Sequence, residues 1–248
     1  SSLARKAGIQ LGLLYYNDNQ PEKALAAYKQ VISNYPGSEE AKIALQDLKS
    51  VYIDLNDINA YASYVNSIGG NIRLEVGEQD SLTYIAAEKL FMRGDNDGAR
   101  RSLINYLQTF PEGAFSSNAN FYLGSIAFAK KEFDEAIQRF KSVIASGDTK
   151  FLEESVARTA EIEYLSKDYP AALESFKRLQ IVAENPENRQ AARLGIMRCA
   201  LQTGQQKDAL LAADELLKEP KLSPELEAEA RYVRAKAYIA QKQANKAL

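Results

Sequence analysis

The residue types that most often carry out catalysis are scarce in this chain. It has no histidine, and therefore lacks the commonest general base and the commonest metal ligand. Its single cysteine, Cys199, lies within an apolar helical pattern, which predicts a buried structural thiol. The carboxylate pairs Glu39-Glu40 and Glu153-Glu154 stand at expected helix starts, where negative charge favours the helix dipole. We therefore expect no catalytic residue, no bound metal and no cofactor.

Small and aromatic residues recur along the chain at regular intervals. Their spacing indicates which structural elements would position a binding site. Alanine returns every 36 to 39 residues, at Ala24, Ala60, Ala99, Ala136, Ala172, Ala209 and Ala247. An aromatic ring follows four residues later at Tyr28, Tyr64, Phe140 and Phe176. A period of this length indicates an array of similar structural repeats. Such arrays form extended binding surfaces.

Each repeat is expected to hold two helices. In the fourth repeat, apolar residues lie at helical spacing over 119–128 and again over 133–144, with a polar turn at 130–132 between them. Gly147 ends the second helix. The first repeat ends at 35–37, where proline cannot continue a helix. The repeating element is therefore a pair of antiparallel helices joined by a tight turn.

This pattern resembles the tetratricopeptide repeat. The first repeat carries its signature residues at Leu11, Gly12, Tyr15, Ala24, Tyr28 and Pro36, and the fourth at Leu123, Gly124, Ala136 and Phe140. The resemblance implies an all-α, right-handed solenoid of about seven helix-turn-helix repeats, the last of them truncated. The expected repeats are 5–38, 41–79, 80–113, 117–150, 153–187, 190–223 and 228–248. They would form a single superhelical domain over 1–248, as a fragment of a longer protein.

The resemblance also implies where a partner would bind, because in tetratricopeptide arrays the first helices of the repeats line a concave face. The aromatic residues expected there are Tyr16, Tyr52, Tyr84, Phe91, Phe121, Phe128 and Tyr164. The remaining positions of this face are Ile9, Leu13, Leu45, Lys49, Glu88, Ser125, Ala157, Glu161, Leu194, Arg198, Leu201, Tyr232, Lys236 and Ile239. Aromatic rings supply large, rigid contact area for a helix or an extended peptide. The alternative is that these rings only pack between neighbouring first helices.

We expect the partner to centre on the rings of the third to fifth repeats. Phe91, Phe121 and Phe128 are the proposed anchors. Glu88 and Glu161 flank them, which favours a partner with basic residues near its apolar anchors.

Composition narrows the class of partner. The net charge is −2, so the chain has no basic surface to replace the counterions of nucleic acid. No apolar run approaches the roughly 18 residues that would predict insertion into a membrane. A protein or peptide partner of a non-enzymatic scaffold is therefore expected.

The compartment and the wider context allow more than one interpretation. The long repeats and their Tyr-Pro-Gly-Ser and Phe-Pro-Glu-Gly segments are similar to bacterial envelope proteins of the barrel-assembly lipoprotein and Tol-Pal coordinator type. This similarity implies the periplasm or the cell envelope, with a cytoplasmic scaffold as the alternative. A second functional hypothesis is a superhelical accessory domain of a larger enzyme, such as a cell-wall glycosidase or a sensor kinase, whose catalytic part lies outside this chain.

Two local expectations concern stability and one loop. Ala136 is placed where the two helices of a pair cross, so a leucine there would cost roughly 1–3 kcal/mol by overpacking. The same change at exposed Lys141 is expected to be harmless. Between residues 66 and 77 the helical pattern lapses, and three apolar residues at 72–76 alternate with polar ones, as in a half-buried extended loop. The alternative is a functional loop that reaches into the groove or onto a partner.

Overall fold

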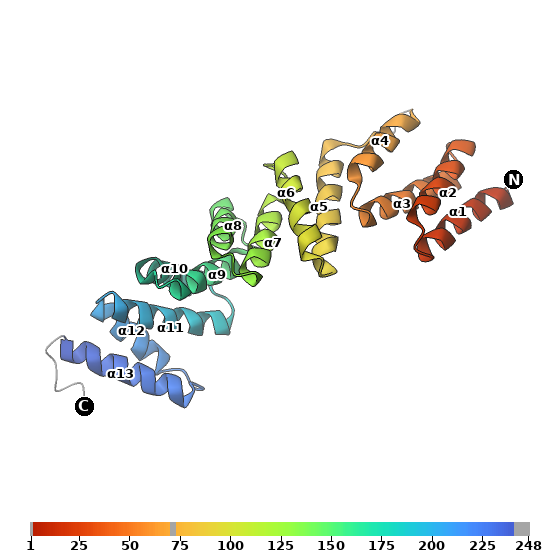
Figure 1. Cartoon of the computed structure of the whole chain (residues 1–248). Helices are drawn as coiled ribbons and strands as arrows, with labels where there is room; N and C mark the ends of the chain where they lie inside the picture. The colour runs from red at the N-terminus through yellow and green to blue at the C-terminus, as the bar shows by residue number, and fades with distance from the viewer. Residues whose placement is uncertain (1, 70–72, 241–248) are drawn as a thin grey trace. The chain divides into compact units, whose positions relative to one another are not determined.

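The described part of the chain, residues 2–69 and 73–240 of a computed structural model, is built from helices (Figure 1). It contains thirteen helices and, within those ranges, no strand. The predicted all-α repeat class is therefore confirmed. Contacts divide the chain into two compact units, Ser1–Ala119 (unit 1) and Asn120–Leu248 (unit 2). The single superhelical domain expected over 1–248 stays a prediction.

Unit 1 consists of helix pairs joined by short turns. Its helices are α1 (Ser2–Asn17), α2 (Pro21–Asn34), α3 (Glu39–Asp54), α4 (Ile58–Ile68), α5 (Val76–Met92) and α6 (Asn96–Thr109), followed by the first residues of α7 (Ser116–Ala129). The turns within the pairs are only a few residues long, so the paired helices run antiparallel. Helix α2 packs against both α1 and α3, and α5 packs against α6.

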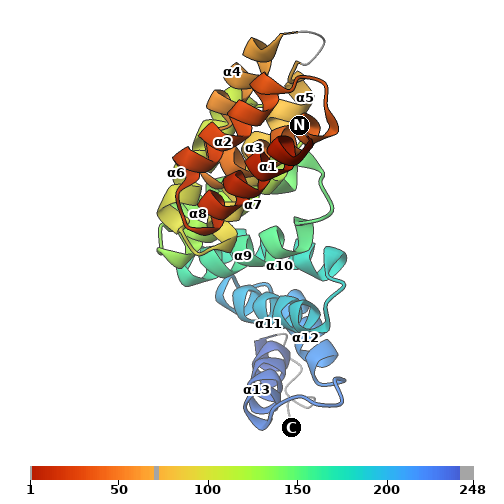
Figure 2. The same cartoon turned by 90° about the vertical axis from the view of Figure 1, so that its right-hand side faces the viewer.

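Unit 2 repeats this arrangement (Figure 2). After the remainder of α7, its helices are α8 (Phe133–Ser146), α9 (Leu152–Leu165), α10 (Tyr169–Val182), α11 (Pro186–Gln202), α12 (Gln206–Leu216) and α13 (Pro224–Ala240). From α8 to α13 each helix packs against the next, and α11 also contacts α9 and α13. Helices α9, α11 and α13 are therefore the first helices of successive repeats and lie side by side.

The turn inside every complete helix pair has the same backbone conformation. One residue adopts a positive φ, between 55° and 82°, at Asn19, Asn56, Gly94, Lys131, Lys167 and Gly204. The next residue is the N-cap of the second helix. In three pairs this N-cap is an aspartate, Asp57, Asp95 or Asp168, whose carboxylate accepts a backbone N–H from the first turn. The left-handed residue reverses the chain and the N-cap starts the next helix.

Small residues bring the helices of a pair together, as the sequence predicts. Five of the recurring alanines have no exposed surface: Ala24, Ala99, Ala136, Ala172 and Ala209. On the first helices, a Cβ atom added to Gly12 would lie 2.4 Å from the ring of Tyr28. One added to Gly124 would lie 2.8 Å from the ring of Phe140. These separations are shorter than van der Waals contact, so only glycine fits at both crossings.

The second repeat departs from the predicted register. Ala60 is only partly buried, and α4 buries Tyr61, Ala62 and Val65 instead. The seventh recurring alanine, Ala247, lies outside the described residues.

The segment between α4 and α5 differs from the extended loop expected at 72–76. Val76 already belongs to α5 and is 72% exposed, so it neither extends nor anchors a loop. Leu74 does pack against the core of unit 1. Ile72 lies outside the described residues. The extended conformation predicted from the alternation of apolar and polar residues is therefore wrong at Val76, where the first turn of a helix begins.

Lys141 is exposed as expected, but it is not isolated. Its Nζ lies 3.0 Å from Oε1 of Glu163, whose side chain is only 6% exposed. The Ser175 hydroxyl donates to the other carboxylate oxygen of Glu163 at 2.6 Å. Replacing Lys141 would remove a partner from a buried charge, so we expect a substitution here to lower stability instead of being neutral.

Candidate functional site

A hollow opens in unit 2 among the residues of α9, α10 and α11. Its volume is about 270 Å³. Its lining residues are Glu154, Ala157, Arg158, Glu161, Tyr164, Leu165, Phe176, Leu179, Asn188, Ala191, Leu194, Gly195 and Arg198. The lining is mostly apolar, and Leu165 at its edge is 56% exposed. A mostly apolar concavity with a few polar groups is typical of a binding site.

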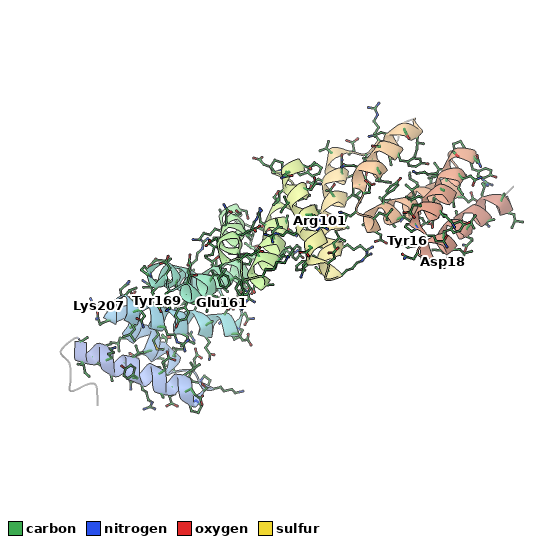
Figure 3. All side chains as sticks on the ribbon, in the orientation of Figure 1. Tyr16, Asp18, Arg101, Glu161, Tyr169 and Lys207 are labelled. Atoms are coloured by element: carbon green, nitrogen blue, oxygen red, sulfur yellow. The ribbon has the colours of Figure 1, made fainter. Side chains whose placement is uncertain are left out.

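Five of the lining residues occupy positions that the sequence assigns to the concave face. Ala157, Glu161 and Tyr164 come from α9, and Leu194 and Arg198 from α11. Glu161 is labelled on α9 in Figure 3. They line one hollow because α9 and α11 lie in contact with each other.

The base of the hollow comes from residues that the sequence assigns only to the core. Phe176 and Leu179 of α10 are 8% and 1% exposed. A Cβ added to Gly195 of α11 would lie 2.4 Å from the Phe176 ring. The missing side chain at Gly195 lets the ring of Phe176 reach the first-helix face. The sequence does contain a signal for this close contact, because Gly195 is a glycine inside an otherwise regular helical pattern.

The charged groups of α9 at the edge of the hollow pair with one another. The Arg158 guanidinium donates to Glu154 at 2.8 Å and to Glu161 at 2.9 Å. Burial alone would lower the pKa of Arg158, but the two carboxylates outweigh it and hold that pKa above its ordinary value. Glu161 was expected to attract basic residues of a partner. In the structure Arg158 pairs with Glu161 and also with Glu154, so these three groups keep one net negative charge and the expectation stays a prediction.

The charged group of α11 is paired as well. The Arg198 guanidinium donates to both carboxylate oxygens of Glu229 on α13, at 2.7 and 2.8 Å. This pair is the main reason that the pKa of Arg198 lies above its ordinary value, with a smaller contribution from the Tyr164 hydroxyl. The same hydrogen bond holds the pKa of Glu229 below its ordinary value. Bidentate pairing fixes Arg198 beside the Tyr164 ring.

The other two predicted rings of unit 2 are half-buried by aromatic and cationic neighbours. The Phe121 ring stacks on Phe151 with centroids 4.2 Å apart. The Phe128 ring lies 4.9 Å below the guanidinium carbon of Arg158. Each ring therefore keeps part of its surface free and continues the first-helix face from the hollow toward α7.

The four predicted rings of unit 1 have different surroundings. Tyr52 and Tyr84 are 5% and 2% exposed, so the expectation that they lie open in a groove is wrong. Tyr84 stacks on Phe115, from the segment after α6, at 4.5 Å. Tyr16 and Phe91 are half-buried, and the Tyr16 hydroxyl donates to the carboxylate of Asp54. A binding role for any of the seven rings stays a prediction.

Comparison with known families identifies the repeats. Family models of the tetratricopeptide repeat match residues 7–38 and 86–149. The chain contains tetratricopeptide repeats in both segments. Tetratricopeptide repeats expose stacked helix faces, and the protein accordingly belongs to the class of protein-interaction scaffolds.

Solved structures of other repeat proteins are similar to this one. PilF of Pseudomonas aeruginosa is 17% identical, with 92% of this chain and 97% of that chain covered and a TM-score of 0.46. PilW, a type IV pilus biogenesis factor, is 15% identical, with 91% and 97% covered and a TM-score of 0.46. MamA is 16% identical, with 69% and 87% covered and a TM-score of 0.49. A comparison with curated protein sequences gave no match.

The described residues show little that could support other chemistry. Across 2–69 and 73–240, no cluster of three or more histidine, cysteine or acidic residues could hold a metal ion. In the same ranges no helix combines the length and apolar character needed to cross a bilayer. Cys199 is fully buried as predicted, and burial raises the pKa of its thiol to about 11. The thiol is therefore protonated and inaccessible at neutral pH.

Proposed function

We propose that this tetratricopeptide protein is a non-enzymatic scaffold that binds a peptide or helix of a partner protein on the first-helix face of unit 2. The observation that carries the proposal is the hollow between α9 and α11. Five of its lining residues hold positions that the sequence assigns to the concave face. It is mostly apolar, and Leu165, Tyr164 and Leu194 leave apolar surface open beside it.

The proposal also rests on how apolar residues gather around the hollow. Exposed leucines scattered singly over a protein are ordinary. Around the hollow, in contrast, Leu165 stands beside Tyr164 and Leu194 in one concave patch. Apolar patches that are concave and rimmed by polar groups mark interaction sites more often than idle surface.

Selection from a phage-displayed library of random peptides would test the proposal. We expect the selected peptides to bind the wild-type protein and to lose at least tenfold in affinity with Leu165→Ser, measured by isothermal titration calorimetry. The matched control is Leu211→Ser, because Leu211 is a 65% exposed leucine on α12, a second helix. Peptides that lose affinity with Leu211→Ser but not with Leu165→Ser would place binding elsewhere and contradict the proposal.

We further propose that the scaffold works in a bacterial cell envelope. The support is the similarity of its long repeats and their proline-glycine segments to envelope repeat proteins. Alkaline phosphatase fused to the full-length protein should be active in the bacterial host, because this enzyme acquires its disulfides only outside the cytoplasm. An inactive phosphatase fusion together with an active β-galactosidase fusion would indicate a cytoplasmic scaffold instead.

A further inference from the structure

We propose that the hollow between α9 and α11 receives a single uncharged apolar side chain of the partner, of leucine or phenylalanine size, and excludes charged ones. This inference rests on the proposed function and specifies the chemistry of the partner at that site. It follows from two observations, the size of the hollow and the pairing of its charges.

The size of the hollow suits one large apolar side chain. Its volume is about 270 Å³. A closed apolar cavity of roughly 150 Å³ accommodates a benzene ring. The hollow of unit 2 is larger and open to the surface, so a phenyl ring or a leucine side chain can enter with its backbone outside. The walls that would contact it are Ala157, Leu165, Phe176 and Leu194.

The charged groups around the hollow are paired within the protein. The lining contains two carboxylates, Glu154 and Glu161, and two guanidinium groups, Arg158 and Arg198. Arg158 binds both carboxylates, and Arg198 binds Glu229 through two hydrogen bonds. Every charged group of the lining therefore already has a partner, and because Arg158 serves two carboxylates the set keeps one net negative charge. A charged partner residue would lose hydration at the apolar wall, and the charged groups beside that wall are already paired with one another.

The position of the paired groups explains how the hollow stays open. Arg158 is held between residues one turn before and one turn after it on α9, so its guanidinium lies along the helix. Arg198 is drawn toward α13 by Glu229. Neither side chain needs to fold into the apolar space between α9 and α11. The ion pairs thus keep two long side chains at the edge, and the apolar wall remains accessible.

Blocked amino acids are suitable probes, because each presents one side chain without terminal charges. We would titrate methyl-labelled protein with N-acetyl amides of leucine, phenylalanine, lysine and glutamate, and follow the methyl signals of Ala157, Leu165 and Leu194 by NMR. The leucine and phenylalanine amides should shift these signals with millimolar affinity, as expected for ligands of this size. Their affinities should change less than twofold between roughly 50 and 500 mM salt, because no charge pairing is involved.

A variant that fills the hollow provides the control for location. Ala157→Leu adds three carbons to the wall and should weaken the leucine and phenylalanine amides by about tenfold or more. Ala228→Leu makes the same change at an exposed site on α13 and should leave both affinities unchanged. Circular dichroism would confirm that both variants keep their helices.

Two results would overturn the inference. One is binding of the lysine or glutamate amide as tightly as the leucine amide. The other is an absence of shifts at the three methyl groups with either apolar amide. If peptides from the phage library still respond to Leu165→Ser, such a result overturns the apolar anchor alone and leaves the proposed function standing. If those peptides fail as well, both proposals fall.

Discussion

Replacing Ala136 by leucine should destabilise the protein. Ala136 has no exposed surface and belongs to a cluster with Ala127, Phe140 and Ile162, which are each at most 1% exposed. Leucine would add three carbons where the helix pair leaves no space. Overpacking of this kind costs about 1–3 kcal/mol. Alanine and leucine differ little in helix propensity, so this cost is not offset.

The matched control is Gln138→Leu, which introduces the same side chain at an exposed position of the same helix. Lys141 is unsuitable, because its ammonium group pairs with buried Glu163. A cost of 2 kcal/mol corresponds to a loss of roughly 4–8 °C in melting temperature for a chain of this size. Thermal melts followed by circular dichroism would measure it. Equal melting temperatures for the two leucine variants would refute the helix-crossing argument.

Three further outcomes are expected. Gly94→Ala should lower the free energy of unfolding by about 1 kcal/mol because φ is +82° there, whereas Gly77→Ala, in the first turn of α5, should not lower it. Guanidinium melts would compare the two variants, and the reverse order of stability would contradict the turn geometry. Lys141→Ala should cost about 1 kcal/mol in the same assay by unpairing Glu163, and a loss that persists when Glu163 is replaced by glutamine would exclude this cause. Cys199 should resist thiol reagents until the protein unfolds. Burial raises the pKa of its thiol to about 11 in the folded protein, against about 8.5 in the unfolded chain. The unfolded state therefore releases the proton first, and the free energy of unfolding should fall above about pH 9. Labelling kinetics and alkaline melts would test this, and rapid labelling of the native protein would contradict it.

The helix pairs could be predicted from sequence because their determinants are local. The recurring alanines and the residues Gly12 and Gly124 contact the other helix of the same pair, which is separated from them in the chain only by a short loop. Left-handed turns and aspartate N-caps recur at the same offsets. Where the local pattern weakens, as at Ala60, the predicted register was off by one or two residues.

The burial of particular rings could not be predicted in this way. Tyr84 is covered by Phe115, which lies in the segment after α6 and outside the repeat pattern. Tyr52 packs against Tyr61 of the irregular second repeat, with ring centroids 6.0 Å apart. A position in a repeat therefore indicates which way a side chain points, while its exposure depends on segments that differ between repeats.

The hollow could be predicted from the sequence only in part. Its edge residues on α9 and α11 were placed on the right face from sequence, and the pairing of Arg158 with Glu154 and Glu161 follows from their spacing along one helix. Its depth depends on Gly195 and Phe176, which come from different repeats. Only the packing of α10 against α11 brings them together.

The most direct test of the account is to map a bound peptide on the protein. A peptide selected from the phage library would be added to methyl-labelled protein, and the shifted methyl signals would be assigned by NMR. Binding on the first-helix face of unit 2 predicts shifts at Ala157, Leu165 and Leu194, with Ile181 and Leu211 of the second helices unaffected. Shifts confined to Ile181 and Leu211 would contradict the assignment of the hollow between α9 and α11 as the binding site.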